Sequence, residues 1–246
     1  MLKDKVVLIT GASSGIGFTT AVTLSKAGAK IVAGARRVDR LRILEKEIQS
    51  YSGEISIIGL DVTKKDECKK FAEFALEKHD RIDVLINNAG LMPLSFFKNL
   101  KIDEWDRMVD VNLKGVLYAT AAVVPNMLSN KSGHIVNISS IAGRIVFPAG
   151  SVYCATKHAV TAFSEGLRQE LSQRANIRVT CIEPGVVDTE LNNTITDDSL
   201  HGFIESVKKM QPLEAQNIAD AIKFAIDSPG HMNVNEIMIR PLHQER

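Results

Sequence analysis

Lys5–Thr10 (KVVLIT), followed at once by Gly11–Gly17 (GASSGIG), decides the fold of this chain. The first stretch is a run of aliphatic and β-branched residues, which is typical of a strand buried on both faces. The second is a glycine-rich turn that opens a helical pattern, and glycine lets the backbone approach a ligand closely. Strand, glycine turn and helix in this order predict an α/β domain with a pyrophosphate site at the helix N-terminus.

Strands and helices alternate along the rest of the chain. Further strand-like runs are Lys30–Ala35, Ile55–Leu60, Asp83–Asn87, His134–Ser139, Ile177–Ile182 and Glu236–Ile239. Helix-length segments such as Val38–Ser50 and Lys64–His79 separate them. The alternation predicts an α/β fold, a Rossmann-type doubly wound parallel sheet of about seven strands with helices on both faces. No linker or repeat interrupts it, so residues 1–246 are predicted to form a single dinucleotide-binding and catalytic domain.

Residues 186–211 break this rhythm. They follow a strand, lack a strong period and contain the polar stretch NNTITDDS. An insertion of this length in a compact domain is more often a functional element than a random excursion. We expect a substrate lid here, and a disordered surface loop is the alternative.

The composition limits the partners and the compartment. The 246 residues are 45% hydrophobic and 24% charged with a formal net charge of +1, which fits a globular protein without a general attraction to nucleic acid or membrane. Cys68, Cys154 and Cys181 cannot all pair, and free thiols are typical of a reducing compartment. With no signal-peptide pattern and no apolar span, we expect a cytoplasmic protein. Cysteine and histidine spacing predicts no metal site.

Polar residues follow the ends of the predicted strands, where ligands of an open parallel sheet bind. The second strand ends at Ala35 and is followed by Arg36 and Arg37. A carboxylate there would hold the adenosine ribose, so its absence beside two guanidinium groups predicts a 2′-phosphate and therefore NADP(H). The alternative is a solvated helix start. Asp61-Val62 after the third strand could contact adenine, and Asn87–Gly90 (NNAG) closes the fourth.

Tyr153 and Lys157 stand four residues apart in YCATK, on one helical face. An ammonium about 4 Å away, at an effective dielectric of about 20, would lower the pKa of the phenol by about three units. That shift would suit a general acid/base, whereas a solvated helix face is the alternative. Ser140 follows the fifth strand and could hold a substrate carbonyl oxygen. Asn112 could cap or kink its helix, or hold a water that relays protons to Lys157.

In this order and spacing, the motifs TGASSGIG, NNAG, the Asn112 segment, Ser140, YCATK and Pro184-Gly185 resemble the short-chain dehydrogenase/reductase family over essentially the whole chain. The resemblance implies a catalytic tetrad of Asn112, Ser140, Tyr153 and Lys157, with Tyr153 as acid/base and Lys157 also on the nicotinamide ribose. Ala35-Arg36 is similar to NADP-preferring members, although Ser14 stands where a basic residue would precede Gly15. The cofactor-binding residues expected from the motifs and the resemblance are Gly11, Ser13, Ser14, Gly15, Ile16, Gly17, Arg36, Arg37, Asp61, Val62, Asn88, Ala89, Gly90, Tyr153, Lys157, Pro184, Gly185, Val187 and Thr189.

The expected function is hydride transfer between NADP(H) and a small alcohol/carbonyl substrate. The tail, His231–Ile237 with Arg240-Pro241, resembles the subgroup that includes NADP-dependent dehydrogenases of serine and other small 3-hydroxy acids. A 3-oxoacyl thioester reductase is one alternative, and a catalytically silent NADP(H)-binding regulator is another.

A homo-oligomer, a dimer or tetramer, is implied by the resemblance. The predicted helices Asp103–Ser129 and Ser151–Arg174 also carry apolar residues on more than one helix face. On a monomer these residues would leave a large apolar patch exposed to solvent. These residues include Ala119, Ala122, Val123, Ala159, Phe163 and Leu167.

Overall fold

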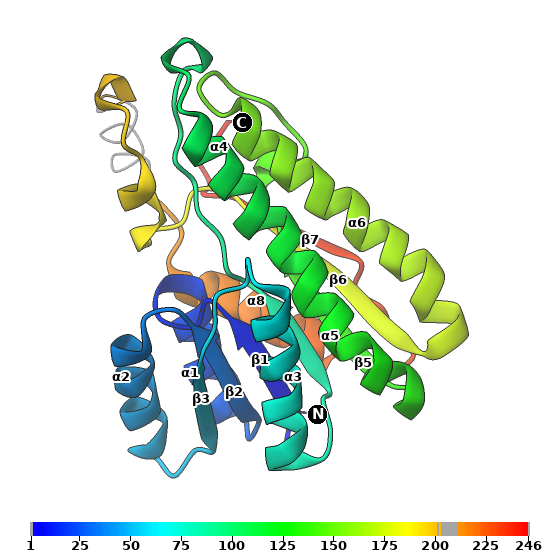
Figure 1. The fold of residues 1–246 in the computed structure, drawn as a ribbon. Coiled ribbons are helices and arrows are strands. Elements are labelled where there is room, and N and C mark those ends of the chain that lie inside the picture. Colours follow the sequence, from blue (N-terminus) through cyan, green and yellow to red (C-terminus); the bar gives the residue numbers. More distant parts are fainter. Residues whose placement is uncertain (1, 201, 203–210, 246) are drawn as a thin grey trace.

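A parallel sheet runs through the computed structural model, which describes residues 2–200, 202 and 211–245. Its order is β3-β2-β1-β4-β5-β6-β7 (Figure 1). The strands are β1 (Val6–Thr10), β2 (Lys30–Ala35), β3 (Ile55–Gly59), β4 (Val84–Asn87), β5 (Gly133–Ile138), β6 (Ile177–Pro184) and β7 (Glu236–Ile239). The seven predicted runs are therefore confirmed as strands, and β6 continues two residues further than expected.

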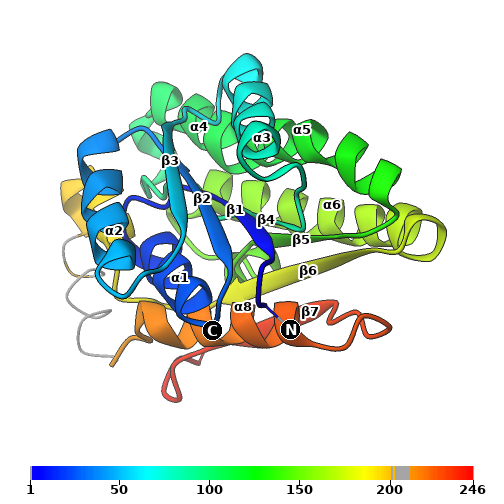
Figure 2. The same cartoon turned by 90° about the horizontal axis from the view of Figure 1, so that it is seen from below.

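Helices cover both faces of the sheet (Figure 2). On one face lie α1 (Gly15–Lys26), α2 (Val38–Gln49) and α8 (Ala215–Asp227). On the other lie α3 (Lys65–His79), α4 (Ile102–Met108), α5 (Gly115–Asn130) and α6 (Ser151–Ala175). Short helical turns are η1 (Phe97–Asn99), η2 (Val109–Lys114), η3 (Ile141–Gly143), η4 (Glu190–Thr194) and η5 (Asp198–Leu200).

Alternate side chains of β1 supply both cores, because successive residues of a strand point to opposite faces. Val7 and Ile9 pack into the apolar cluster beneath α1, α2 and α8. Val6 and Leu8 pack into the cluster beneath α3 and α5. The strand is fully buried, which explains why its sequence is apolar without alternation.

The strand order changes direction between β1 and β4, which are neighbours in the sheet although two strands separate them in the chain. In an open α/β sheet this point leaves a crevice beyond the carboxyl ends of the strands. The glycine turn after β1 and the Asn88–Gly90 segment after β4 both lie there. The predicted single-domain, doubly wound fold is confirmed.

The helix predicted over Asp103–Ser129 is present, because α4, η2 and α5 follow one another without a break from Ile102 to Asn130. Its middle turn, η2, is π-helical instead of α-helical. The expectation that Ala119 and Val123 enlarge an exposed patch is wrong, because both are buried against the sheet. Residues 201 and 203–210 of the predicted lid lie outside the described residues. Among the helices that the structure describes, none is long and apolar enough to cross a membrane.

Candidate active site

The glycine turn after β1 is shaped by close backbone contacts. Gly11 and Gly15 have φ angles of +67° and +54°, a region that side chains disfavour. A Cβ on Gly11 would lie 2.7 Å from the Cα of Ala89, so only glycine fits between β1 and β4. Ser14 precedes α1 without a side-chain hydrogen bond to the helix. The first backbone donors of α1 are therefore available to an anion.

Asn88 ties the two strand ends together. Its side-chain amide donates to the carbonyl oxygens of Thr10 (3.0 Å) and Gly11 (3.1 Å), and its backbone N–H donates to the Thr10 hydroxyl (3.1 Å). Gly17 packs against the same side chain, since a Cβ there would lie 2.4 Å from Asn88 Nδ2. Two predicted cofactor residues thus also have structural contacts that hold the turn.

Arg36 and Arg37 differ in their surroundings. Arg37 donates to the hydroxyls of Ser13 and Ser14, and it forms a 2.8 Å ion pair with Glu190 of η4. The hydrogen bond from Arg37 lowers the pKa of Glu190. The guanidinium of Arg36 forms no hydrogen bond or ion pair with any residue that the structure describes. Its guanidinium therefore keeps its donors for a ligand.

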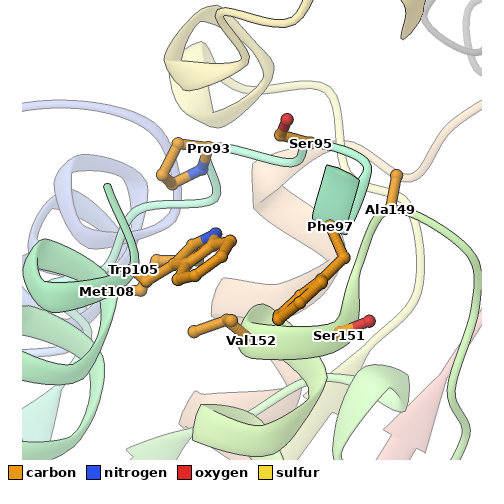
Figure 3. A pocket seen from close by; sticks show the side chains of 8 residues that line it. All are labelled: Pro93, Ser95, Phe97, Trp105, Met108, Ala149, Ser151 and Val152. Atoms are coloured by element: carbon orange, nitrogen blue, oxygen red, sulfur yellow. The ribbon is translucent and has the colours of Figure 1, made fainter. Parts of the chain in front are cut away.

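One cleft of about 1050 Å³ extends from these arginines to the residues after β5 and β6. All of the predicted site residues line it except Gly17 and Asn112. A second hollow is lined by eight residues that include Phe97 and Trp105, whose rings stack with centroids 4.9 Å apart (Figure 3). Its volume is about 10 Å³. Since this is room for about one water molecule, the large cleft is the candidate active site.

Asn112 is buried behind the cleft, in the π-helical turn η2. Its side chain accepts from the backbone N–H of Leu91 at 2.9 Å and donates to the carbonyl of Leu91 at 2.9 Å. It also donates to the hydroxyl of Thr156 at 3.3 Å. Of the two interpretations of Asn112, the one in which it lies at an irregular point of its helix is confirmed. The side chain joins η2 to the segment after β4 and to α6.

Ser140, Tyr153 and Lys157 come together on the cleft wall, each less than 10% exposed. The Ser140 hydroxyl accepts from the backbone N–H of Ala142 at 3.0 Å, which fixes it at the start of η3. Lys157 donates from Nζ to the carbonyl of Ile138 at 2.9 Å. Its ammonium lies 5.8 Å from the centre of the Tyr153 ring.

Burial dominates the electrostatics of this group. It raises the pKa of Tyr153 to about 12, against the opposing effect of a hydrogen bond with Ser140. Burial also lowers the pKa of Lys157 to about 8. The expectation that Lys157 lowers the pKa of the phenol is not met, because burial raises that pKa and the ammonium is directed to the carbonyl of Ile138. At neutral pH the phenol carries its proton.

The segment after β6 is attached at several points. Asp197 is buried and accepts hydrogen bonds from Ser95 (2.8 Å) and Asn99 (2.7 Å), both in the segment after β4. Thr194 accepts from the backbone N–H of Met92 at 3.0 Å. Glu190 pairs with Arg37 on the opposite side. The described part of this segment therefore contacts both the residues after β4 and Arg37 after β2.

Glu190 and Gln244 are among the cleft-lining residues that sequence reasoning missed. Gln244 accepts through Oε1 from the backbone N–H of Val186 at 2.9 Å, so the tail supports the loop after β6. Their contacts join parts of the chain 153 and 58 residues apart, and no local pattern marks them.

Comparisons with known proteins agree with this geometry. The family model for short chain dehydrogenases matches residues 5–200. An uncharacterized oxidoreductase of Staphylococcus saprophyticus is 51% identical over 99% of this chain and 98% of its own length. A serine dehydrogenase in its closed form with NADP⁺ has a TM-score of 0.90 at 33% identity, over 98% of this chain and 96% of that one. An alcohol dehydrogenase from Thermococcus sibiricus with 5-hydroxy-NADP has a TM-score of 0.88 at 28% identity, over 99% of both chains.

The chain belongs to the short-chain dehydrogenase family, a class of oxidoreductase enzymes.

Proposed function

We propose that this enzyme moves a hydride between NADP(H) and a small alcohol/carbonyl substrate, with Tyr153 as the general acid/base. One observation carries the proposal: Ser140, Tyr153 and Lys157 line the same cleft as the glycine turn. A dinucleotide with its phosphates on that turn would extend toward the buried phenol.

The other end of the cleft fits NADP(H). Gly11 and Gly15 allow the positive φ angles and the close packing of the turn, and the N-terminus of α1 has free donors for a pyrophosphate. No carboxylate follows Ala35, whereas Arg36 has donors that no described residue uses. The NADP-type complexes of the serine dehydrogenase and of the archaeal alcohol dehydrogenase support the same cofactor.

In the proposed reduction, Tyr153 donates its phenolic proton to the carbonyl oxygen, and the Ser140 hydroxyl donates a hydrogen bond to the same oxygen. NADP(H), when bound, supplies or accepts the hydride. The raised pKa of Tyr153 keeps the proton on the phenol at neutral pH, which suits a proton donor. In alcohol oxidation the phenolate accepts the proton instead.

Lys157 and Asn112 act behind the phenol in this proposal. Both flank Gly90: a Cβ built there would lie 3.5 Å from Asn112 Oδ1 and 3.9 Å from Lys157 Nζ. Lys157 would bind the nicotinamide ribose and stabilise a phenolate by its charge. Asn112 would keep Leu91 in place and would hold a water molecule that relays protons to Lys157.

Two further expectations belong to the proposal. Residues 186–211 act as the lid over bound substrate, in line with the contacts of Asp197 and Thr194. The enzyme works as a homo-oligomer, and sedimentation of only a 27.0 kDa species at micromolar concentration would refute that part.

The test of the mechanism is Tyr153→Phe, which removes the hydroxyl and keeps the ring. We expect kcat to fall by about 10²–10⁴-fold, because proton transfer by a positioned group contributes about that much. NADPH binding should stay within about threefold of wild type, well below one decade of affinity. Tyr118→Phe, outside the cleft, is the matched control. A Tyr153→Phe enzyme that keeps more than about a tenth of kcat would contradict the assignment.

A further inference from the structure

We infer that the substrate is an uncharged aldehyde, ketone or alcohol with apolar substituents, and not a hydroxy acid. The inference rests on the proposed function, since it concerns what Tyr153 protonates. It departs from the serine-type subgroup that the tail resembles and from the serine dehydrogenase to which the fold is similar.

The phenol of Tyr153 lies in an apolar cluster. The buried members of this cluster besides Tyr153 are Leu91, Leu94, Met108, Ala142, Cys154 and Leu200. Of these, Leu91, Leu94, Ala142 and Leu200 also line the cleft. A substrate whose oxygen reaches the phenol therefore places its substituents against aliphatic side chains.

An aromatic wall closes the same region. Phe147 lines the cleft and packs against the cluster around Tyr153. A Cβ on Gly150 would lie 2.3 Å from the Phe147 ring, so the ring lies flat against the backbone. A ring fixed in this way presents an apolar face and offers no hydrogen bond to an anion.

The positively charged side chains that line the cleft have partners other than a substrate or are exposed to solvent. Among the described lining residues they are Arg36, Arg37, Arg107 and Lys157. Arg37 is paired with Glu190, and Lys157 donates to the carbonyl of Ile138. The charge of Arg36 acts on Asp61, at the adenosine end. Arg107 is exposed on α4, so water screens its charge.

A carboxylate next to the reacting carbon would thus lie against the apolar residues around Tyr153, which offer it neither a charge nor a hydrogen bond. An unpaired buried charge is strongly disfavoured. An ester or a ketone of the same skeleton has no such penalty and gains from contact with the apolar wall. The cleft therefore discriminates by charge more than by size.

Matched pairs of compounds test this inference. With NADPH, the wild-type enzyme is assayed on ethyl acetoacetate against acetoacetate and on ethyl pyruvate against pyruvate. We expect kcat/KM to be higher for each ester by about 100-fold, since a charged group left unpaired costs at least that factor. With NADP⁺, 2-butanol should be oxidised in preference to serine.

An engineered charge supplies the second arm. Val146 lines the cleft and is 76% exposed, so a larger side chain there should not disturb the core. Val146→Arg should reduce the ratio of kcat/KM for the ester to kcat/KM for the acid. The neutral control Val146→Gln should reduce this ratio less than Val146→Arg does.

Three results would overturn the inference. One is a kcat/KM for an acid that equals or exceeds that of its ester. In that case, an increased KM for the acid in Arg107→Ala would identify Arg107 as the residue that binds the carboxylate. Another is preferred oxidation of serine. The third is an enzyme that binds NADPH but reduces no ester. If Tyr153→Phe is inactive on a preferred acid, only the substrate class is wrong; if that variant remains active, the proposed function fails instead.

Discussion

Arg37 and Glu190 form an ion pair at 2.8 Å that connects the residues after β2 to those after β6. The same guanidinium donates to Ser13 and Ser14, so it holds the glycine turn and the segment after β6 together. A ligand phosphate that approaches Arg37 therefore meets the Glu190 carboxylate. One side chain therefore contacts both the glycine turn and the segment after β6.

Glu190→Gln should strengthen NADPH binding by about two- to fivefold and leave NADH binding unchanged. The carboxylate and a 2′-phosphate compete for Arg37, but both side chains are about half exposed, so the effect is that of a surface pair. Fluorescence titration with both cofactors measures it. An equal change for NADH and NADPH would show that Glu190 acts on the turn and not on the phosphate.

Arg36→Ala should weaken NADPH binding by about 10- to 100-fold and NADH binding much less, because one charge-assisted contact to the phosphate is lost. Arg42→Ala removes an exposed charge on α2 outside the cleft and is the matched control. The measurement is kcat/KM for both cofactors. Equal values for NADPH and NADH in the wild-type enzyme would refute the predicted preference.

Alcohol oxidation should accelerate as the pH rises from about 6 to about 9. Oxidation needs the phenolate, and burial raises the pKa of Tyr153 to about 12, so the deprotonated fraction grows about tenfold per pH unit throughout this range. Reduction needs the protonated phenol and should lack this increase. Because the lowered pKa of Lys157 lies near 8, the profile is also measured in Lys157→Arg, which keeps its charge. A flat oxidation profile in both enzymes would be incompatible with a phenol that titrates so high.

Arg144→Ala should lower the free energy of unfolding by about 3 kcal/mol, measured in urea. Arg144 donates from Nε to both carboxylate oxygens of Glu183, at 2.9 and 3.0 Å, and Glu183 is only 1% exposed. Removal of the cation leaves a buried charge without its partner, a type of change that costs about 3–5 kcal/mol. Since Arg144 is one third exposed, we expect the lower end of that range.

Two further variants separate this charge effect from lost packing. Arg144→Met combined with Glu183→Gln should recover most of the stability, because no buried charge remains. Glu236→Gln removes the half-exposed second partner of Arg144 and should cost less than about 1 kcal/mol. If the double variant is as unstable as Arg144→Ala, the burial of the charge is not the cause.

The sheet could be predicted from the sequence because each strand has a local signal. The residues of β1 are buried on both faces, so hydrophobicity alone identifies the strand. The glycine turn and Tyr153–Lys157 were also visible, since their chemistry lies within a few neighbouring residues. Residue spacing does not indicate burial. The spacing predicts that Lys157 lies beside Tyr153, but it cannot predict the loss of water that raises the pKa of the phenol.

Long-range contacts were beyond prediction for a different reason. Glu190 and Gln244 are ordinary polar residues in irregular segments, and their positions depend on how distant parts of the chain pack. Asn112 is an intermediate case. Its low helix propensity indicated a local irregularity, whereas its paired hydrogen bonds to Leu91 required the structure.

Because η2 is a wide turn, the position of the Asn112 side chain depends on the number of residues in this segment as much as on their types. A π-helical turn corresponds to one residue more than a regular helix would need. Deletion of a single residue from Val109–Lys114 would restore a regular helix with α4 and α5 in register, but it would remove the wide turn that carries Asn112. Asn112 would then turn away from Leu91, although every residue type around it was kept. Two chains that share this asparagine are thus comparable here only if no insertion or deletion separates them within η2.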